Sequence, residues 1–408
     1  MKKQTVIIKR LMPLLIAMCL QNFVLWYAIE KLFMTSIGFD TASIAIIASV
    51  YAATMLVFET PSGILADRWS RKGVLIIAGV ALALSSLIGG LSPGVIIYIL
   101  SAVAWGVYYA LYSGTFDSMV YDTLVEETGS GDDFEKYSGR LQAIAGISLV
   151  ASSFLGGVVG QLLSLQSVYF LTIPFALASI VALILFKEPQ LHKATEHVSV
   201  RQQVSATFAA ISKKGIVLQI TATLVLLMLL DQMVFEFSQL WLIALIAPVI
   251  IYGPANALLL SSVVFSGFFA SVFAKSRKLL FISLGLMLAS VFALALVKNI
   301  AVVVAALFIV AFVAIIFQIV FSKQLHDRLS SNIRAGAVSA LSSVSKLVFI
   351  PVALLFGFTS QQTSVFSGAW IIIIIALLTT VFAAMVLGSI KRIRPLRDEF
   401  QAIDEARK

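Results

Sequence analysis

Residues 63–72 read GILADRWSRK, and long apolar runs flank them on both sides. Asp67 is followed closely by the bases Arg68, Arg71 and Lys72, all within a stretch short enough to form one loop. Charge of this density between two apolar runs predicts a tight polar turn at a membrane surface. At such a turn a carboxylate pairs with a nearby base such as Arg71 or with the positive N-terminal end of another helix.

The chain as a whole is too apolar for a water-soluble protein. Of its 408 residues, 60% are hydrophobic and 12% are charged, and the mean hydropathy is +1.02. A typical soluble domain is about 45–50% apolar and about 25% charged. The composition therefore predicts an all-α integral membrane protein. The single cysteine, Cys19, excludes an intrachain disulfide, and the histidines show no metal-ligand spacing, so neither a metal nor a cofactor is expected.

Twelve apolar stretches are long enough to cross a membrane, which takes about 20 residues. The first is interpreted as a retained span rather than a signal peptide, because no small-residue cleavage site follows it. The apolar stretch 240–255 is interpreted as a link that folds back between the seventh and eighth spans. The expected spans are 11–34, 41–65, 73–91, 94–116, 140–163, 167–186, 216–239, 253–274, 279–297, 300–321, 335–358 and 366–390.

Basic residues orient these spans and divide them into two sets. With the N-terminus inside, all of the 29 Lys and Arg residues except Lys31, Lys298 and Lys346 fall on the cytoplasmic side. The net charge of +9 is thus a topology signal rather than a sign of nucleic-acid binding. The long polar segment 187–215 separates a six-helix bundle (1–186) from a second one (216–390), and 391–408 form a cytoplasmic tail. Internal duplication of this kind is typical of transporters, and Arg71-Lys72 is echoed by Arg277-Lys278.

The stretch GILADRWSRK resembles the signature loop of the major facilitator superfamily, roughly G-x-L-x-D-R-x-G-R-K. It lies between the second and third spans, where that family has it, and Ser70 replaces the usual glycine. The resemblance implies two pseudo-symmetric six-helix bundles, and a gate in which Asp67 contacts the eleventh span. Gly63, Asp67, Arg68, Arg71 and Lys72 are the expected gating residues. Gly63 and Pro61 are expected to let the second span bend and approach a neighbour closely.

Ionisable and polar side chains inside the spans are the candidates for coupling or substrate binding, because burying them in hydrocarbon costs about 2.5–3.5 kcal/mol on insertion scales. Lys346 is expected roughly 16 Å deep in the eleventh span, near the midplane. Asp231 is its potential partner, and a fixed ion pair between them is the structural alternative. The remaining candidates are Gln232 and Glu236 on the seventh span, Gln21 and Asn22 on the first, and Glu59 on the second. Glu59 either joins the Asp67 network or titrates during coupling, whereas Glu30 and Lys31 are interpreted as an interfacial anchor.

The fourth span has one aromatic face, formed by Trp105, Tyr109, Tyr112 and Phe116 with Tyr108 beside them. In the resembled family the first, fourth, seventh and tenth spans line the central cavity. The face therefore either stacks a flat or cationic ligand or packs against other helices. The acidic segment after this span is interpreted as a solvated inner loop, in which Asp117 or Asp122 pairs with Arg140.

Together these observations predict a secondary active transporter that works by alternating access and exports small lipophilic or cationic compounds in exchange for protons. The span-four arginine common in proton-coupled exporters of the family is absent, and span five has Gly156, Gly157 and Gly160 without the usual proline. Uptake of a nutrient or organic anion at Lys346 is therefore the alternative, and a non-transporting sensor or scaffold is the alternative of another class. No catalytic constellation is present, so no enzyme is expected. The expected protein is a monomer in a bacterial cytoplasmic membrane, with both termini inside, a small-molecule substrate, protons and lipid as partners, and no nucleic acid.

Overall fold

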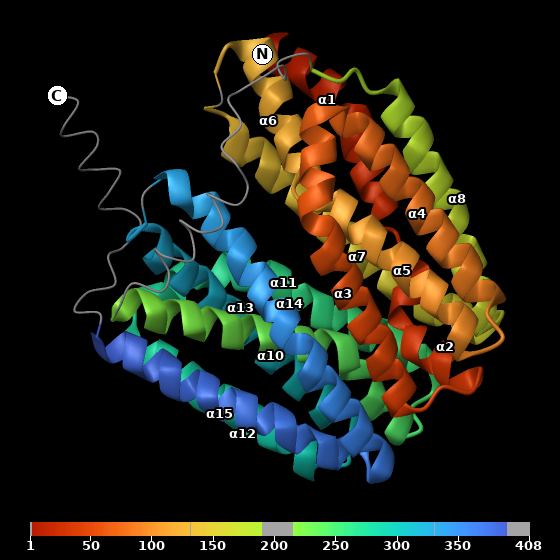
Figure 1. The fold of residues 1–408 in the computed structure, drawn as a ribbon, viewed down its shortest axis with the longest axis vertical. Coiled ribbons are helices and arrows are strands. Elements are labelled where there is room, and N and C mark those ends of the chain that lie inside the picture. Colours follow the sequence, from red (N-terminus) through yellow and green to blue (C-terminus); the bar gives the residue numbers. More distant parts are fainter. Residues whose placement is uncertain (1, 131, 190–214, 330, 390–408) are drawn as a thin grey trace. The chain divides into compact units, whose positions relative to one another are not determined.

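The computed structural model describes residues 2–130, 132–189, 215–329 and 331–389, and these residues form helices and no strands (Figure 1). Twelve segments of this described part are long and apolar enough to cross a membrane. The expected all-α membrane fold is confirmed.

The first half of the chain contains seven long helices, a short one and a 3₁₀ turn. They are α1 (Lys2–Gln21), the 3₁₀ helix η1 (Leu25–Ala28), α2 (Glu30–Ser36), α3 (Thr41–Arg68), α4 (Arg71–Leu91), α5 (Val95–Tyr112), α6 (Thr115–Thr128), α7 (Phe134–Leu162) and α8 (Leu165–Leu185). The second half contains α10 (Ile216–Ala244), α11 (Val249–Ala274), α12 (Arg277–Leu296), α13 (Ile300–His326), α14 (Ser331–Gln362) and α15 (Val365–Ser389).

The sequence echo between the two halves is also a structural echo. Helix α4 begins at Arg71 with Ser70 as its N-cap, whose side chain accepts a hydrogen bond from the backbone N–H of Gly73. Helix α12 begins at Arg277 with Ser276 as its N-cap, whose side chain accepts from Leu279. A serine hydroxyl at this position satisfies one of the free N–H groups of the first turn. The two Ser-Arg-Lys stretches therefore start corresponding helices in the same way.

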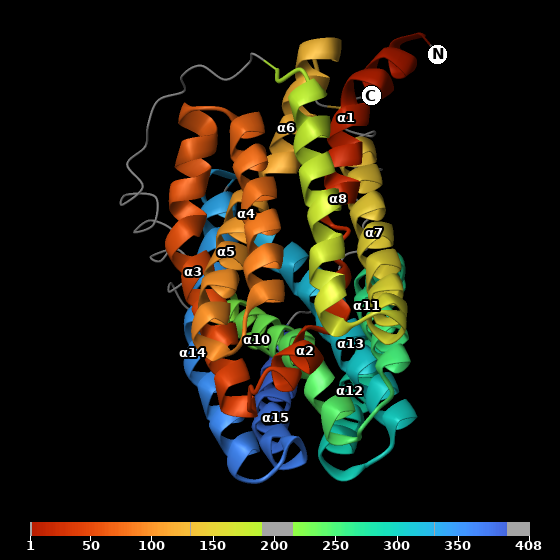
Figure 2. The same cartoon turned by 90° about the vertical axis from the view of Figure 1, so that its right-hand side faces the viewer.

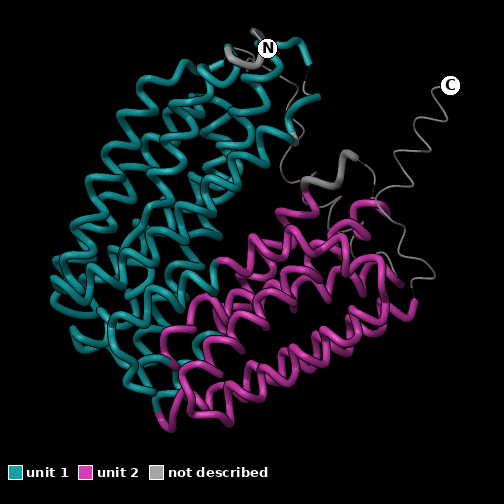
Figure 3. The backbone as a smooth tube through the Cα atoms, turned by 180° about the vertical axis from the view of Figure 1, so that it is seen from behind, with its two compact units in different colours: residues 1–196, 242–260, 353–361 teal, residues 197–241, 261–352, 362–408 magenta. Residues whose placement is uncertain are grey.

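The described chain forms two compact units (Figure 3). Unit 1 consists of 1–196, 242–260 and 353–361, and unit 2 consists of 197–241, 261–352 and 362–408. Parts of α11 and α14 thus belong with the helices of the first half. Most of 187–215 and the tail lie outside the described residues, so the division into two bundles joined by a linker stays a prediction.

Glycine allows the α11 and α14 segments to pack closely in unit 1. A Cβ at Gly253 of α11 would lie 2.7 Å from the carbonyl oxygen of Phe154, and one at Gly157 would lie 2.5 Å from the nitrogen of Gly253. On α14, a Cβ at Gly357 would lie 2.2 Å from the Cβ of Ala45. Such spacing excludes any side chain and lets the helix backbones touch. The expected close packing of the span-five glycines is found at Gly157.

Two expected spans have different limits in the structure. The first span is not the continuous stretch 11–34, because α1 ends at Gln21 and residues 22–24 are not helical. The stretch 240–255 does not fold back: α10 continues to Ala244 and α11 begins at Val249, with only a short turn between them. In that turn Ile246 adopts a φ of 51°, which reverses the chain without a longer link.

The acidic segment after the fourth span is helix α6 rather than a solvated loop. Helix α5 ends at Tyr112, Gly114 adopts a φ of 73°, and α6 begins one residue later. Together α5 and α6 form an apolar segment of 34 residues, Val95–Thr128, which exceeds the length of a single crossing. The fourth span is therefore a broken helix that extends past the membrane surface, with α6 alongside α1 (Figure 2).

Candidate functional site

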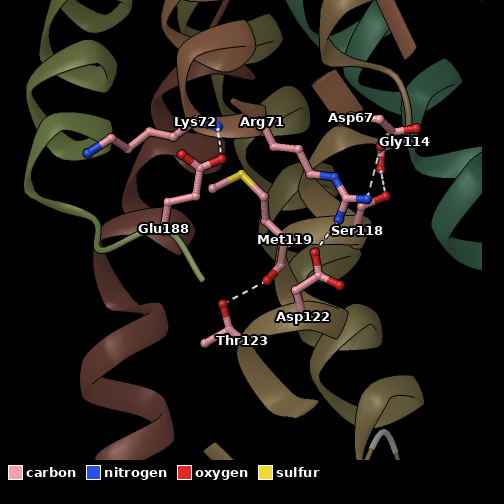
Figure 4. Close-up of polar contacts among 9 residues, drawn as sticks. All are labelled: Asp67, Arg71, Lys72, Gly114, Ser118, Met119, Asp122, Thr123 and Glu188. Atoms are coloured by element: carbon pink, nitrogen blue, oxygen red, sulfur yellow. Dashed lines mark hydrogen bonds and ion pairs between the residues drawn. The ribbon is translucent and has the colours of Figure 1, made fainter. Parts of the chain in front are cut away.

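The charged loop at 63–72 brings together one arginine and two carboxylates. The Arg71 guanidinium at the start of α4 forms an ion pair of 3.1 Å with Asp67 near the end of α3, and a second ion pair with Asp122 of α6 (Figure 4). The side chain of Asp122 is 8% exposed, whereas that of Asp67 is 66% exposed. The expected pairing of Asp67 with Arg71 is confirmed, and Asp122 is a partner that the sequence analysis assigned to Arg140 instead. Arg140 lies over the ring of Tyr137.

Ser70 and Lys72 tie this loop to the end of α8. The Ser70 hydroxyl donates to Glu188 over 2.7 Å, and the backbone N–H of Lys72 donates to the same carboxylate over 3.1 Å. The Lys72 amine donates to the carbonyls of Ile184 and Phe186, where α8 ends. Because Ser70 has an extended φ of −168°, this position does not require glycine. The departure from the family pattern therefore adds a hydrogen bond rather than strain.

The other two residues of the motif are open to their surroundings. Arg68 is exposed, and a Cβ at Gly63 would meet nothing within 4 Å among the described residues. The expected close approach of α3 at Gly63 is therefore not present. A close approach occurs instead at Thr54 of α3, because a Cβ at Gly106 of α5 would lie 2.7 Å from the Cβ of Thr54.

The breaks in the first and fourth spans meet. The amide nitrogen of Asn22, the first residue after α1, donates to the hydroxyl of Tyr112, the last residue of α5, over 2.8 Å. One turn away, the Tyr108 hydroxyl donates to the carbonyl of Gln21 over 2.9 Å. Tyr112 lies ten residues before Asp122, with the helix break at Ser113-Gly114 between them. Non-helical backbone inside a membrane span occurs where it is buried in protein or lines an aqueous cavity.

Side chains from two further helices, α7 and α8, hold the break in the first span. Ser148 of α7 donates to the carbonyl of Cys19 over 2.5 Å, and Thr172 of α8 accepts from the backbone N–H of Leu25 over 3.2 Å. A Cβ at Gly156 of α7 would lie 2.0 Å from the carbonyl oxygen of Leu25. The break is thus a fixed feature of the fold, because its free backbone groups have partners.

The aromatic face of the fourth span divides into two parts. Trp105, Tyr108 and Phe116 are buried, and Trp105 packs edge-on against Trp26 of η1 with ring centroids 4.8 Å apart. Tyr109 and Tyr112 are half-buried, and their ring centroids lie 6.1 Å apart. The buried rings fit the packing alternative, whereas Tyr109 and Tyr112 remain candidates for ligand contact.

Glu30 and Lys31 form a buried ion pair rather than an interfacial anchor. The Lys31 amine lies 2.8 Å from Glu30, and the two residues are 3% and 8% exposed respectively. The Tyr98 hydroxyl donates to Glu30 over 3.3 Å and shares a hydrogen bond of 2.7 Å with Tyr169. The anchor interpretation is wrong because the first span breaks early and leaves α2 packed inside unit 1.

The polar candidates on the first two spans have different surroundings. Gln21 is fully buried and donates to the carbonyl of Leu75, while its amide oxygen has no partner among the described residues. Glu59 is half-buried on α3. A coupling role for Gln21, Asn22 or Glu59 stays a prediction.

The candidate charges of the second half lie in unit 2. One carboxylate oxygen of Asp231 on α10 is buried without a hydrogen-bond partner, and the amide of Gln318 on α13 faces this carboxylate. Lys346 on α14 is 9% exposed and donates to Ser342 over 2.5 Å. Gln232 and Glu236 are half-buried on α10. Asp231 and Lys346 therefore have different neighbours, and the proposed pair is not formed here.

Sequence reasoning missed Glu188, the Glu30–Lys31 pair and the helix break at 22–24. Neither glycine nor proline occurs at 22–24, so no local signal marks that break. The break in the fourth span had a signal, since Ser113-Gly114 interrupts the apolar run.

Twelve apolar helices with ionisable groups inside them are typical of membrane transporters. The family model of the Major Facilitator Superfamily matches residues 11–348. The chain belongs to this superfamily.

Individual relatives are distant. The chain is 27% identical over 139 residues to the uncharacterized MFS-type transporter YdeG of Bacillus subtilis, covering 31% of this chain and 32% of the relative. It is 22% identical over 173 residues to the class H tetracycline resistance protein of Pasteurella multocida, covering 42% of each. The matches thus span less than half the length of these curated relatives.

Solved structures share the fold at low identity. The nucleoside transporter NupG superposes with a TM-score of 0.73 at 17% identity, covering 93% of this chain and 99% of NupG. A bacterial homolog of the human lysosomal transporter Spinster gives 0.76 at 11%, covering 97% and 99%. The D-xylose-proton symporter gives 0.68 at 13%, covering 92% and 97%.

Proposed function

We propose that this transporter works by alternating access and exports small lipophilic or cationic compounds in exchange for protons. The observation that carries the proposal is Asp231, whose buried carboxylate has an oxygen without a hydrogen-bond partner among the described residues. A carboxylate in this state gains from binding either a proton or a cation, so both ligands compete for one group. Competition of this kind is what exchange requires.

Three further features support export. Tyr109 and Tyr112 present half-buried rings beside two broken helices, and such rings attract cations and flat apolar molecules. Asp67, the residue that the family resemblance places in the gate, forms an ion pair with Arg71 at the charged loop. The tetracycline resistance protein is a relative whose name indicates a role in drug resistance. We place the protein in a bacterial cytoplasmic membrane with both termini inside.

The test uses purified protein in liposomes with an imposed pH gradient and a set of fluorescent lipophilic cations. We expect gradient-driven cation movement in the wild type and its loss in Asp231→Asn. Asp132→Asn, which changes an exposed acid between α6 and α7, serves as the control and should transport normally. Wild-type liposomes that move no cation under the gradient would reject the exporter.

Uptake of a nutrient or organic anion is the second candidate, and Lys346 favours it. This lysine is nearly buried in α14, and ionisable side chains inside membrane spans often mark the path of a substrate or ion. The neighbours NupG and the D-xylose-proton symporter are named for nucleosides and a sugar, so the fold also accommodates polar nutrients. A thermal-shift screen of anionic compounds distinguishes the two: stabilisation that disappears in Lys346→Met, without cation transport, would favour uptake.

A further inference from the structure

The breaks in the first span (22–24) and the fourth span (Ser113-Gly114) form a junction. A carboxylate at this junction has no basic partner among the described residues. Asp117 lies in the first turn of α6, directly after the break at Ser113-Gly114, and is half-buried. Its oxygens accept hydrogen bonds from the Ser138 hydroxyl over 2.6 Å and from the Gln142 amide over 3.2 Å, both on α7. Both donors are neutral, so its negative charge is oriented but not compensated by a base among the described residues.

The other acids of α6 are already paired with bases. Asp122, one turn further along α6, binds Arg71, and Glu126 and Glu127 at the end of α6 both bind Arg10 of α1. Asp117 is therefore different from the rest of the acids on this helix.

Space and aromatic surface lie beside this carboxylate. Ser113 and Gly114 are exposed, and a Cβ at Gly114 would meet nothing within 4 Å among the described residues. The half-buried ring of Tyr112 lies directly before the break. Tyr109 follows one turn higher. Exposed backbone at this depth requires water or a ligand rather than lipid.

The hydrogen-bonding capacity at the junction is only partly used. Both N–H groups of the Asn22 amide are used, one by Tyr112 and one by the carbonyl of Met18. Tyr112 accepts from Asn22 and so keeps its own proton available as a donor. An aromatic cation is recognised by aromatic rings, hydrogen-bond donors and a carboxylate whose charge is not compensated. All three occur here within a few residues.

We propose that Asp117, with the rings of Tyr109 and Tyr112, forms a binding subsite for the positively charged group of a planar aromatic cation. The inference rests on the proposed export function and deepens it by assigning charge recognition in unit 1 to Asp117. Tyr109 and Tyr112 contact the ring system, and the Asn22–Tyr112 hydrogen bond holds Tyr112 in position.

The test compares two fluorescent probes with one ring system: N-methylacridinium, which is permanently charged, and acridine, which is uncharged at mildly alkaline pH. Binding is measured on the full-length protein in nanodiscs. Wild type should prefer the cation, and Asp117→Asn should weaken cation binding by about tenfold while leaving acridine binding unchanged. Asn keeps the size of the side chain and one accepting oxygen for Ser138 or Gln142, and retained acridine binding shows that the variant is folded.

Two controls define the outcome. Asp132→Asn removes an exposed acid and should change neither affinity. Tyr109→Leu should weaken the binding of both probes, because the tyrosine ring contacts the ring system that the probes share.

Absence of N-methylacridinium binding to wild type would overturn the subsite. An Asp117→Asn variant that keeps its preference for the cation would also overturn it. Loss of that preference in Asp231→Asn but not in Asp117→Asn would also overturn it.

Different experiments would reject the proposed subsite and the proposed export function. Cation binding through Asp117 without gradient-driven transport would keep the subsite and reject export. Transport under a pH gradient by an Asp117→Asn variant with unchanged cation affinity would keep export and reject the subsite.

Discussion

The Tyr108 hydroxyl donates a 2.9 Å hydrogen bond to the carbonyl of Gln21, the residue at which α1 stops. Both residues are buried, at 2% and 0% exposure. A tyrosine of the fourth span thus supplies the partner that the next helical turn of the first span would otherwise provide.

Tyr108→Phe should destabilise the protein, because it keeps the ring but leaves a buried carbonyl without a donor. The expected loss is about 1–3 kcal/mol of unfolding free energy. Thermal unfolding in detergent measures it. The matched control is Tyr121→Phe, which removes a hydroxyl from an exposed tyrosine on α6 and should be almost neutral. Equal melting temperatures for the two variants would show that the bond to Gln21 contributes nothing.

Gly156→Ala should be more damaging, because the new methyl group would lie 2.0 Å from the carbonyl oxygen of Leu25. Backbone atoms cannot move aside as a side chain can, so we expect a loss of at least about 3 kcal/mol. Gly285→Ala on α12 is the control, since nothing lies within 4 Å of its Cβ among the described residues. There the better helix propensity of alanine should stabilise by up to about 1 kcal/mol. Melting temperatures that shift in the same direction for both variants would contradict the close contact.

Much of the fold could be predicted from the sequence, because it depends on composition and local pattern. Apolar length and the polar breaks determine the number of spans, and both are visible in a single chain. The Asp67–Arg71 pair could also be predicted, because the two residues are four positions apart in the short charged stretch between two apolar spans. Ser70 and Ser276 mark the starts of α4 and α12 for the same local reason.

The remaining features depend on tertiary contacts. The first span breaks at Asn22 without glycine or proline because hydroxyls of α5, α7 and α8 satisfy its backbone. Because of the same break, Glu30 and Lys31 lie in the interior of unit 1. Their depth could not be predicted by counting residues along an unbroken helix. Asp122 meets Arg71 from 51 residues away, and no spacing rule predicts such a pair.

The two carboxylates of Arg71 should differ in their effect on stability. Asp122→Asn should cost about 3 kcal/mol, because it leaves a partly buried guanidinium with one exposed partner. Asp67→Asn removes a pair on the exposed side and should cost less than about 1 kcal/mol. Thermal unfolding of both variants in one detergent provides the comparison. Added salt should reduce the difference in unfolding free energy between wild type and Asp67→Asn. The difference between wild type and Asp122→Asn should fall by less, because exposed ion pairs are screened more strongly. The reverse order of stability would contradict the assignment of Asp122 as the main partner.

Asp40, which lies before α3 and outside the spans, should make stability depend on pH only under acidic conditions. Its carboxylate accepts hydrogen bonds from the backbone and hydroxyl of Ser43, which lower its pKa below the ordinary value of 3.8, and it also accepts from Gln361 over 2.6 Å. A lowered folded-state pKa means that the stabilisation is complete above 3.8 and is lost as the pH falls through the folded-state value. Asp40→Asn keeps an N-cap side chain but does not titrate. The melting-temperature difference between wild type and Asp40→Asn should therefore be constant from neutral pH down to about 3.8 and then decrease. A difference that changes near neutral pH, or that grows in acid, would show that Asp40 does not act through this carboxylate.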